Sequence, residues 1–362
     1  MTYEIEVLSW SDRKKWNEIG RSFENWDLYF TPEYSKVYEN IGDGKVQAFV
    51  YKDDNLTVLY PYLLKKVNDL AVFDDLEEEY FDIASPYGYC GPLFSEKTND
   101  KNQIEKSTES FFEAFHKYCK ENNIVTEFVR FHPILNNAKL ARKHIKTEFQ
   151  GKTVASNLRR RWSDMWDDEF DSDTRSKIRK SIRNDIQVNL ARKDEIKEIM
   201  PVFKKLYYST MDKNDARDYY YFDHNYFKGF EELLLDDIII FYAIHNKKII
   251  AASLVMVKSD YVHIHLTGSK KEFLNLGCNN LIRYRILEWA KFNKFSYVHH
   301  GGGKESLLKF KKGFSNLSFN FHIGRKVHNQ KKYSKLKQIW KKKNEVDDDN
   351  FDYLPIYRLD IE

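Results

Sequence analysis

The chain has 362 residues, of which 42% are hydrophobic and 16% aromatic, and it carries a formal net charge of +4. This composition excludes an intrinsically disordered protein, and the length allows two domains with full cores. No apolar run approaches a membrane span, and the N-terminus does not resemble a signal peptide, so we expect a cytoplasmic protein without a transmembrane segment. The cysteines are few and widely separated, which suits a reducing compartment and predicts no metal site: Cys90, Cys119 and Cys278.

Two segments have the pattern of a β-hairpin. The first covers residues 45–63 and the second covers residues 238–257, and in each a short polar turn separates two β-prone runs. Each hairpin is followed later in the chain by an amphipathic helix that leads into a strand. These helix–strand units cover residues 111–131 and 281–299.

The same order of hairpin, helix and strand, found twice, predicts an α+β fold with two similar domains in tandem. Each domain is expected to hold a mixed, mostly antiparallel sheet flanked by helices. The alternative is coincidence, because these units are common. We place the boundary near residues 149–152, which gives domains of residues 1–150 and 151–362, the second with a basic C-terminal segment.

Residues 173–185 have the pattern of a helix that Asp171, Ser172 or Asp173 could cap. Ile178 and Ile182 are expected to dock this helix on the core. Basic residues four positions apart share one of its faces and could bind phosphate or carboxylate, or form a solvated face: Arg175, Arg179 and Arg183.

A β-prone run ends at three consecutive glycines, Gly301 to Gly303, and a basic amphipathic helix follows at once. Glycines at a strand end allow close approach of a ligand and present backbone amides, although a turn with positive φ would also need them. Lys311 lies between Phe310 and Phe314 on this helix, which suggests a partner for an oxyanion or phosphate. The alternative is a surface lysine like its neighbours.

The histidines of two β-prone runs are candidate metal ligands or bases. His263 and His265 share a strand face, and His299 and His300 precede the glycines. No third ligand is visible in the sequence, so ordinary strand histidines are the favoured interpretation.

The segment from Lys304 to Lys343 is rich in lysine and arginine and has the pattern of a strand at 319–327 and a helix at 330–343. It could contact a nucleic-acid backbone or an anionic lipid surface, or be an ordinary lysine-rich surface.

In four places the chain resembles the FemABX family of peptidoglycan-bridge aminoacyltransferases, within the GNAT acyltransferase superfamily. The matching segments occur in the family's order: Phe30-Thr-Pro-Glu-Tyr34, Asp82-Ile-Ala-Ser-Pro-Tyr-Gly-Tyr-Cys-Gly-Pro92, Arg175-Ser-Lys-Ile-Arg-Lys180, and Gly301-Gly302 through Phe310-Lys311 to Phe314. The resemblance implies two GNAT domains in tandem and the transfer of an activated acyl group to a primary amine. The donor would be an aminoacyl-tRNA or an acyl-CoA, with no bound cofactor.

The resemblance also implies roles for particular residues. Lys311 corresponds to the family's functional lysine and is the predicted catalytic residue. The predicted substrate-binding residues are Tyr87, Gly88, Tyr89, Arg175, Arg179, Gly301, Gly302, Gly303, Phe310 and Phe314. The predicted donor-binding residues stand where GNAT enzymes have a pyrophosphate loop: Gly277, Asn279 and Asn280.

Two departures from the family pattern concern the substrates. A family lysine that binds the precursor's pyrophosphate falls on Tyr38, with Lys36 the nearest lysine, which counts against a muramyl-peptide acceptor. The segment from Asn275 to Asn280 is only a partial pyrophosphate loop, although a helix N-terminus can still receive phosphate.

The sequence therefore predicts an acyltransferase that forms an amide on a cell-envelope precursor, a peptidoglycan or polysaccharide unit, by direct attack of the acceptor amine. We expect it to act in the cytoplasm, with tRNA and the inner membrane surface as further candidate partners. The alternative is a non-catalytic RNA- or anionic-surface-binding protein on a degenerate GNAT fold.

Overall fold

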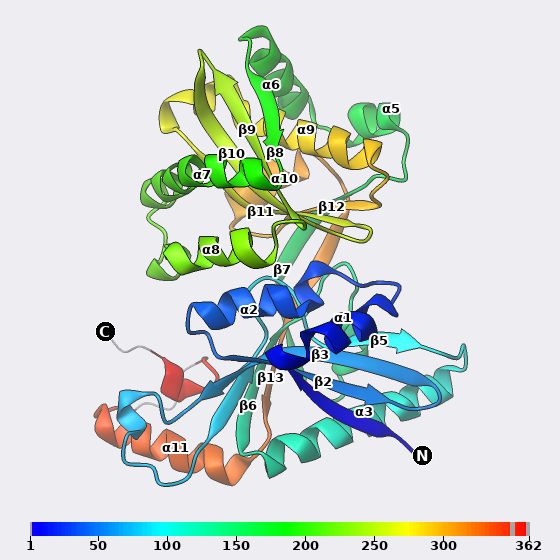
Figure 1. Ribbon diagram of the computed structural model, residues 1–362, viewed down its shortest axis with the longest axis vertical. Coiled ribbons are helices and arrows are strands. Elements are labelled where there is room, and N and C mark those ends of the chain that lie inside the picture. The colour runs from blue at the N-terminus through cyan, green and yellow to red at the C-terminus, as the bar shows by residue number, and fades with distance from the viewer. Residues whose placement is uncertain (1, 348–351, 360–362) are drawn as a thin grey trace. The chain divides into compact units, whose positions relative to one another are not determined.

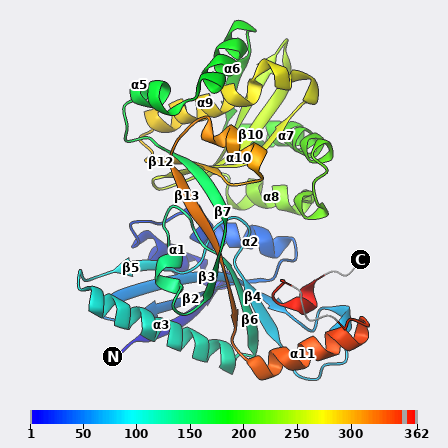
Figure 2. The same ribbon diagram turned by 180° about the vertical axis from the view of Figure 1, so that it is seen from behind.

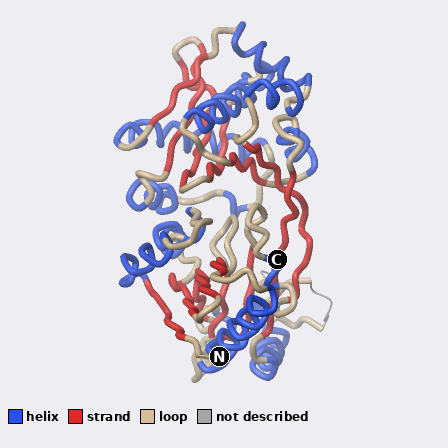
Figure 3. The backbone as a smooth tube through the Cα atoms, turned by 90° about the vertical axis from the view of Figure 1, so that its right-hand side faces the viewer, coloured by secondary structure: helices blue, strands red, loops and turns tan. Residues whose placement is uncertain are grey.

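The computed structural model describes residues 2–347 and 352–359, which form two compact units (Figure 1). Unit 1 contains the chain before Asn25, from Tyr29 to Gln150 and from Phe321 onward. Unit 2 contains Asn25–Leu28 and Gly151–Asn320. Helices flank the strands in each unit (Figure 3).

Unit 1 is built on a sheet with the strand order β1-β2-β3-β4-β6-β13, and β5 pairs with β3. Its strands are β1 (Glu4–Ser9), β2 (Lys45–Lys52), β3 (Leu56–Lys66), β4 (Phe81–Ala84), β5 (Leu93–Glu96), β6 (Ile124–Arg130) and the greater part of β13 (Ser318–Val327). Its helices are α1 (Arg13–Arg21), α2 (Pro32–Asn40), α3 (Lys101–Glu121), α4 (Ala138–Ala141) and α11 (Gln330–Lys343).

The core of unit 1 lies between this sheet and α3, which Figure 2 shows on the face turned toward the viewer. Phe49 and Tyr51 lie two positions apart on β2 and so share one face of the sheet, where they meet Phe111 and Phe115 of α3. The helix α2 begins at Thr31, whose hydroxyl accepts a hydrogen bond from the Tyr34 amide.

Unit 2 has the strand order β8-β9-β10-β11-β12-β7. Its strands are β8 (Gln187–Ala191), β9 (Ile238–His245), β10 (Lys248–Lys258), β11 (Tyr261–Ser269), β12 (Tyr297–Gly301) and the end of β7 (Lys146–Asn157). Its helices are α5 (Trp162–Asp164), α6 (Ser172–Arg183), α7 (Asp194–Lys213), α8 (His224–Leu233), α9 (Cys278–Phe292) and α10 (Glu305–Lys312).

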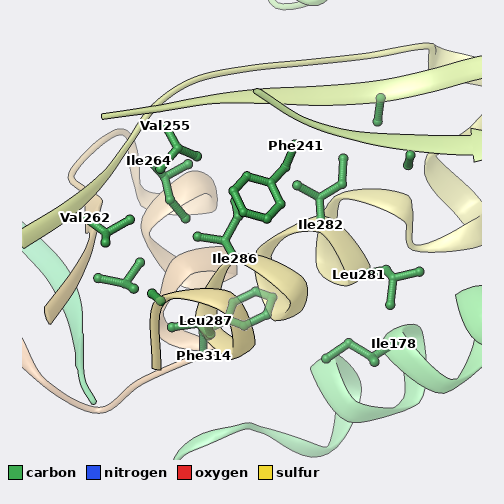
Figure 4. Close-up of a cluster of buried hydrophobic side chains, with 14 of the residues drawn as sticks. Ile178, Phe241, Val255, Val262, Ile264, Leu281, Ile282, Ile286, Leu287 and Phe314 are labelled. Carbon is green, nitrogen blue, oxygen red and sulfur yellow. The ribbon is translucent and has the colours of Figure 1, made fainter. Parts of the chain in front are cut away.

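The core of unit 2 lies between the sheet and α9. Figure 4 shows Ile282, Ile286 and Leu287 of α9 gathered around Phe241 of β9, with Phe314 beside them. These α9 residues recur at helical spacing, which is the pattern that predicted the helix from the sequence. The predicted helix at 281–293 is confirmed as part of α9.

The two units repeat one pattern of strands. In each, an antiparallel hairpin leads to a third strand that runs parallel to a fourth: β4 with β6 in unit 1, and β11 with β12 in unit 2. Both predicted hairpins are present as β2–β3 and β9–β10. The α+β fold class and the tandem repeat of two similar units are therefore confirmed.

The strand that completes each pattern comes from a distant part of the chain. β7 follows β6 in sequence, but its residues Val154–Asn157 pair with β12. β13 follows β12, but its residues Ile323–Val327 pair with β6. The predicted division after residue 150 coincides with a change of unit, whereas the segment from Phe321, which we had placed in the second domain, belongs to unit 1.

Packing of α11 gives a second reason for this difference. Leu336 and Trp340 of α11 are buried in a cluster with Val67, Phe73 and Tyr80 of unit 1. The predicted helix at 330–343 has the bounds of α11, but the residues on which it packs could not be predicted from its own sequence.

The helix α6 matches the prediction for residues 173–185, and the Asp171 carboxylate caps it by accepting from the Thr174 amide. Ile178 is fully buried, but the expected docking of Ile182 is wrong, because its side chain is 48% exposed. Thr174, Ile178 and Ser181 form the buried stripe instead.

In the part of the chain that the structure describes, no helix combines the length and the apolar character that crossing a membrane would require.

Candidate active site

Lys311 lies in the last turn of α10, the helix that follows the glycine run. Its side chain is buried, with 8% of the residue exposed, whereas Lys309 and Lys312 on the same helix are exposed. The Lys311 ammonium donates to the backbone carbonyl of Gly302. The glycine run and Lys311 are thus brought together, and the glycines supply a carbonyl that holds the lysine.

Arg283 of α9 lies beside Lys311 and is also buried, at 6% exposure. Its Nη1 lies 2.6 Å from Nδ1 of His300, and Nε2 of His300 lies 2.9 Å from the Ser156 hydroxyl. A guanidinium can only donate, so His300 Nδ1 must accept. A neutral His300 therefore carries its proton on Nε2 and donates it to Ser156.

Two aromatic rings enclose the guanidinium of Arg283. Its central carbon lies 5.2 Å from the ring centroid of Phe310 and 5.6 Å from that of Phe314. Both phenylalanines were predicted to belong to the site, and both flank Lys311 in sequence. We call Ser156, Arg283, His300, Phe310, Lys311 and Phe314 the basic cluster.

Burial changes the ionisation of all three basic groups in this cluster. It lowers the pKa of Lys311 to about 7, with a further lowering by the charge of Arg283. It lowers the pKa of Arg283 to about 9. Burial, followed by the charges of Arg283 and Lys311, holds the pKa of His300 well below its usual range, which agrees with a neutral imidazole.

The low pKa of Lys311 predicts a pH dependence of stability. Its pKa is about 7 in the folded chain and 10.5 for a lysine in water, so between these pH values the unfolded chain binds more protons. The free energy of unfolding of the wild type should rise with pH in this window, relative to Lys311→Met, by at most about 1.4 kcal/mol per pH unit. Urea unfolding at pH 7, 8 and 9 measures this, with Lys312→Met as the exposed control. Parallel curves for wild type and Lys311→Met would contradict the expectation.

The glycines of the run have structural reasons to be glycine. Gly301 and Gly303 have φ angles of +76° and +144°, which side chains rarely adopt. A Cβ on Gly302 would lie 3.0 Å from the carbonyl oxygen of Lys152. The run is therefore a tight strand-to-helix turn, and it also holds Lys311.

The predicted donor-binding residues lie at the N-terminus of α9. Gly277 precedes the helix with φ of +78°, and a Cβ there would lie 2.7 Å from the carbonyl oxygen of Lys177 on α6. Asn279 donates to the Ser269 hydroxyl and Asn280 is buried. The close approach of α6 thus explains the glycine, and the role of these three residues in donor binding stays a prediction.

Gly277→Ala should destabilise the chain more than Gly42→Ala does. Both glycines have positive φ, but a Cβ on Gly42 would meet nothing within 4 Å. Gly42→Ala should cost about 1 kcal/mol of unfolding free energy from backbone strain. Gly277→Ala adds the clash with Lys177, roughly 1 to 3 kcal/mol more. If the two variants lose the same free energy of unfolding, measured by heat or urea, then α6 shifts to accommodate the new methyl group at no energetic cost.

The arginines of α6 are already engaged within unit 2. Arg175 Nη1 donates to the backbone carbonyls of Trp166, Asp167 and Phe170, and so closes the π-helical turn at Met165–Glu169. Arg179 is exposed, and its guanidinium lies over the Trp166 ring. These contacts give Arg175 a structural role, while substrate binding by both arginines stays a prediction.

The predicted loop Tyr87–Tyr89 lies in unit 1 and is half-buried. Tyr34 donates to the Tyr87 carbonyl, and the Tyr89 ring packs on the ring of Tyr29. A Cβ on Gly88, where φ is +92°, would lie 2.6 Å from the Tyr29 ring. The loop is therefore shaped by its own aromatic contacts.

Tyr38 and Lys36, where the sequence departs from the family pattern, also lie in unit 1. Tyr38 is fully buried, with its hydroxyl 3.1 Å from that of Tyr34. Lys36 forms an ion pair of 2.7 Å with Glu39.

The histidines of β11 and β12 form a second buried network in unit 2. Both carboxylate oxygens of Asp27 lie within hydrogen-bond distance of His263 Nε2, at 2.8 and 3.0 Å. His263 Nδ1 lies 3.3 Å from His299 Nδ1. His265 contacts the Tyr226 hydroxyl, and burial, with the charge of His263, lowers its pKa to about 3.

Sequence reasoning missed Arg283, Ser156 and Asp27. For Arg283 a signal existed, because it precedes the buried residues Ile286 and Leu287 by three and four positions and so lies on the apolar stripe of α9. A charged residue on such a stripe is a candidate for a buried functional group. Ser156 and Asp27 join their networks through tertiary contacts that no local pattern reveals.

Comparison with known proteins agrees with this architecture. The sequence matches the model of the FemAB-like family, described as peptidoglycan biosynthesis/recognition, over residues 85–346. A crystal structure of FemX aligns with a TM-score of 0.66 at 13% identity and covers 92% of this chain and 100% of that chain. No curated protein matches the sequence.

Two further solved structures share the fold. A conserved protein of unknown function from Bacteroides thetaiotaomicron VPI-5482 aligns with a TM-score of 0.57 at 11% identity, covering 90% of this chain and 99% of that one. The C-terminal domain of a putative lysylphosphatidylglycerol synthetase from Agrobacterium fabrum aligns with a TM-score of 0.51 at 12% identity, covering 89% and 93%.

The family match spans more than half of the chain and includes the Tyr87–Tyr89 loop, α6, the glycine run and Lys311. This match shows that the chain belongs to the FemAB-like family.

Proposed function

We propose that this protein is an acyltransferase that moves an aminoacyl or acyl group onto a primary amine of a cell-envelope precursor in the cytoplasm. The observation that carries the proposal is Lys311, a buried lysine held against the glycine run inside a fold of the FemAB-like family. The family description, peptidoglycan biosynthesis/recognition, supports a peptidoglycan precursor as the acceptor.

In the proposed reaction the neutral acceptor amine attacks the carbonyl carbon of the donor ester or thioester directly. A C–N bond forms, the C–O or C–S bond breaks, and the amine proton ends on the leaving oxygen or sulfur. The Lys311 ammonium stabilises the negative oxygen of the tetrahedral intermediate. One of its three N–H groups is held by Gly302, which leaves two that can face a ligand.

The surroundings of Lys311 support this role. Burial removes competing water and strengthens each electrostatic contact. Negative charge near a lysine with a pKa of about 7 favours the protonated form. The oxyanion therefore recruits the charge that stabilises it.

Separate assays with each donor test the proposal. Purified protein is incubated with a lysine-containing muramyl pentapeptide and either labelled acetyl-CoA or aminoacyl-tRNA, and amide product is measured by mass spectrometry. We expect product with one donor class. Acetyl-CoA turnover without any effect of charged tRNA would assign the acyl-CoA version, and no product with either donor would contradict the proposal for this acceptor.

The alternative of an RNA- or anionic-surface-binding protein has weaker support. Part of the basic charge on α11 is matched by acidic residues of unit 1: Lys332 pairs with Glu78, and Lys343 pairs with Asp74 and Asp75. These pairs reduce the positive potential that a phosphate backbone would meet. A strong salt dependence of RNA binding, together with the absence of acyl transfer, would favour this alternative.

A further inference from the structure

Arg283 is an unusual residue for the interior of a protein. It is 6% exposed, and burial is the single cause that lowers its pKa, with no contribution from an acidic group. Lys311 is lowered by burial and by Arg283, again with no acidic group contributing. Buried charges are normally paired, because desolvating an isolated charge is costly. Both residues are buried, and no acidic group among the described residues contributes to the pKa shift of either one.

The hydrogen bonds of Arg283 are also incomplete. Its Nη1 donates to His300, but its buried Nε has no hydrogen-bond partner in the described part of the chain. Leaving a buried donor without an acceptor costs free energy, and such groups often mark a missing ligand or water. The guanidinium lies over the rings of Phe310 and Phe314. These cation–π contacts do not replace a hydrogen-bond acceptor in the plane of the guanidinium.

The glycine run lies between this interior and solvent. Gly301 and Gly302 are half-buried and Gly303 is exposed, while the Gly302 carbonyl holds the Lys311 ammonium. Lys311 therefore lies against the partly exposed backbone of the run.

We propose that Arg283 and Lys311 form a buried subsite that binds an oxyanion group, a phosphate or a carboxylate, of an incoming molecule. The anion accepts from Arg283 Nε and from one of the two remaining N–H groups of Lys311, which leaves the other for the oxyanion of the proposed reaction. His300 holds the guanidinium from its other side. This binding site goes beyond acyl transfer and holds whether or not the chain is a transferase.

Binding should be measured with simple anions by isothermal titration calorimetry. Sulfate represents the tetrahedral phosphate type and does not titrate near neutral pH, and acetate represents the carboxylate type. We expect saturable binding of one of them to the wild type, and the stronger ligand identifies the chemical type. Arg283→Met should weaken binding about tenfold or more, because it removes a charge-assisted hydrogen bond.

Arg285→Met is the matched control, since Arg285 lies on the same helix but is exposed and pairs with Glu288. It should bind the anion as the wild type does. Arg283→Lys, which keeps the charge and loses the planar fork, serves if the methionine variant does not fold, and it should also bind more weakly. Wild-type affinity in the Arg283 variants, or an equal loss in Arg285→Met, would overturn the subsite.

Proton uptake gives a second readout. At pH 7.5, sulfate binding to the wild type should take up a fraction of a proton, because the anion favours the charged form of Lys311. Titrations in two buffers of different ionisation enthalpy measure it. Lys311→Gln should abolish the uptake, and an unchanged uptake in that variant would remove Lys311 from the subsite.

Discussion

Replacing Lys311 with alanine should lower the rate of acyl transfer by about 100- to 1000-fold, the range seen when one donor to an oxyanion is removed. The loss should fall on kcat more than on KM, since the proposed contact forms with the negative oxygen of the intermediate and not with the neutral carbonyl. The same substitution removes an isolated buried charge, so the fold should remain and thermal unfolding should not fall sharply.

Lys309→Ala and Lys312→Ala are the matched controls for this experiment, because both lysines are exposed on the same helix. They should retain activity within about twofold, as surface substitutions usually have small effects. An active Lys311→Ala variant would exclude the proposed role of this residue. An inactive variant with an altered circular dichroism spectrum would indicate a folding defect and would count against the stated stability.

Asp27→Ala should destabilise the chain by about 1 to 3 kcal/mol, the usual cost of leaving a buried hydrogen-bonding group without its partner. Asp27 is fully buried and both of its oxygens contact His263, which is itself 1% exposed. Without the carboxylate, the Nε2 proton of His263 loses its acceptor. Urea unfolding at pH 7 measures the loss.

Asp236→Ala is a suitable control for this prediction, because Asp236 is exposed in the turn before β9. Its free energy of unfolding should change by less than about 0.5 kcal/mol. Asp27→Asn keeps the shape and one acceptor oxygen, so it should fall between the two. A loss below about 1 kcal/mol for Asp27→Ala would mean that the network of His263 and His299 is not stabilised by the carboxylate.

The helices and strands could be predicted from the sequence wherever one local pattern was strong. The β-prone runs and polar turns of the two hairpins and the helical spacing of α9 involve neighbours in sequence, so local patterns were enough to predict them. The pairing of β13 with β6 could not be predicted, since the residues of a strand do not determine by themselves which strand it pairs with. That pairing also explains why the described residues from Phe321 onward, which were predicted as part of the second domain, group with unit 1 by their contacts.

The candidate site likewise contains residues that the sequence predicted and residues that it did not. Lys311, Phe310 and the glycines are close in sequence, so one motif identified them together. Arg283 comes from another helix, and its approach to His300 depends on how α9 packs on β12. Sequence spacing could have marked Arg283 as buried, but only the tertiary structure reveals that it lies beside Lys311 without an acidic partner.

The exchange of terminal strands has a consequence for synthesis on the ribosome. The chain emerges from its N-terminus, yet β6 receives its outer neighbour only when residues 323–327 have been made. Until then one side of β6 is an open edge that can pair with other nascent chains. Folding of the N-terminal unit is therefore timed by the translation of nearly two hundred later residues, and a message truncated after residue 150 would encode a sheet with its edge uncovered.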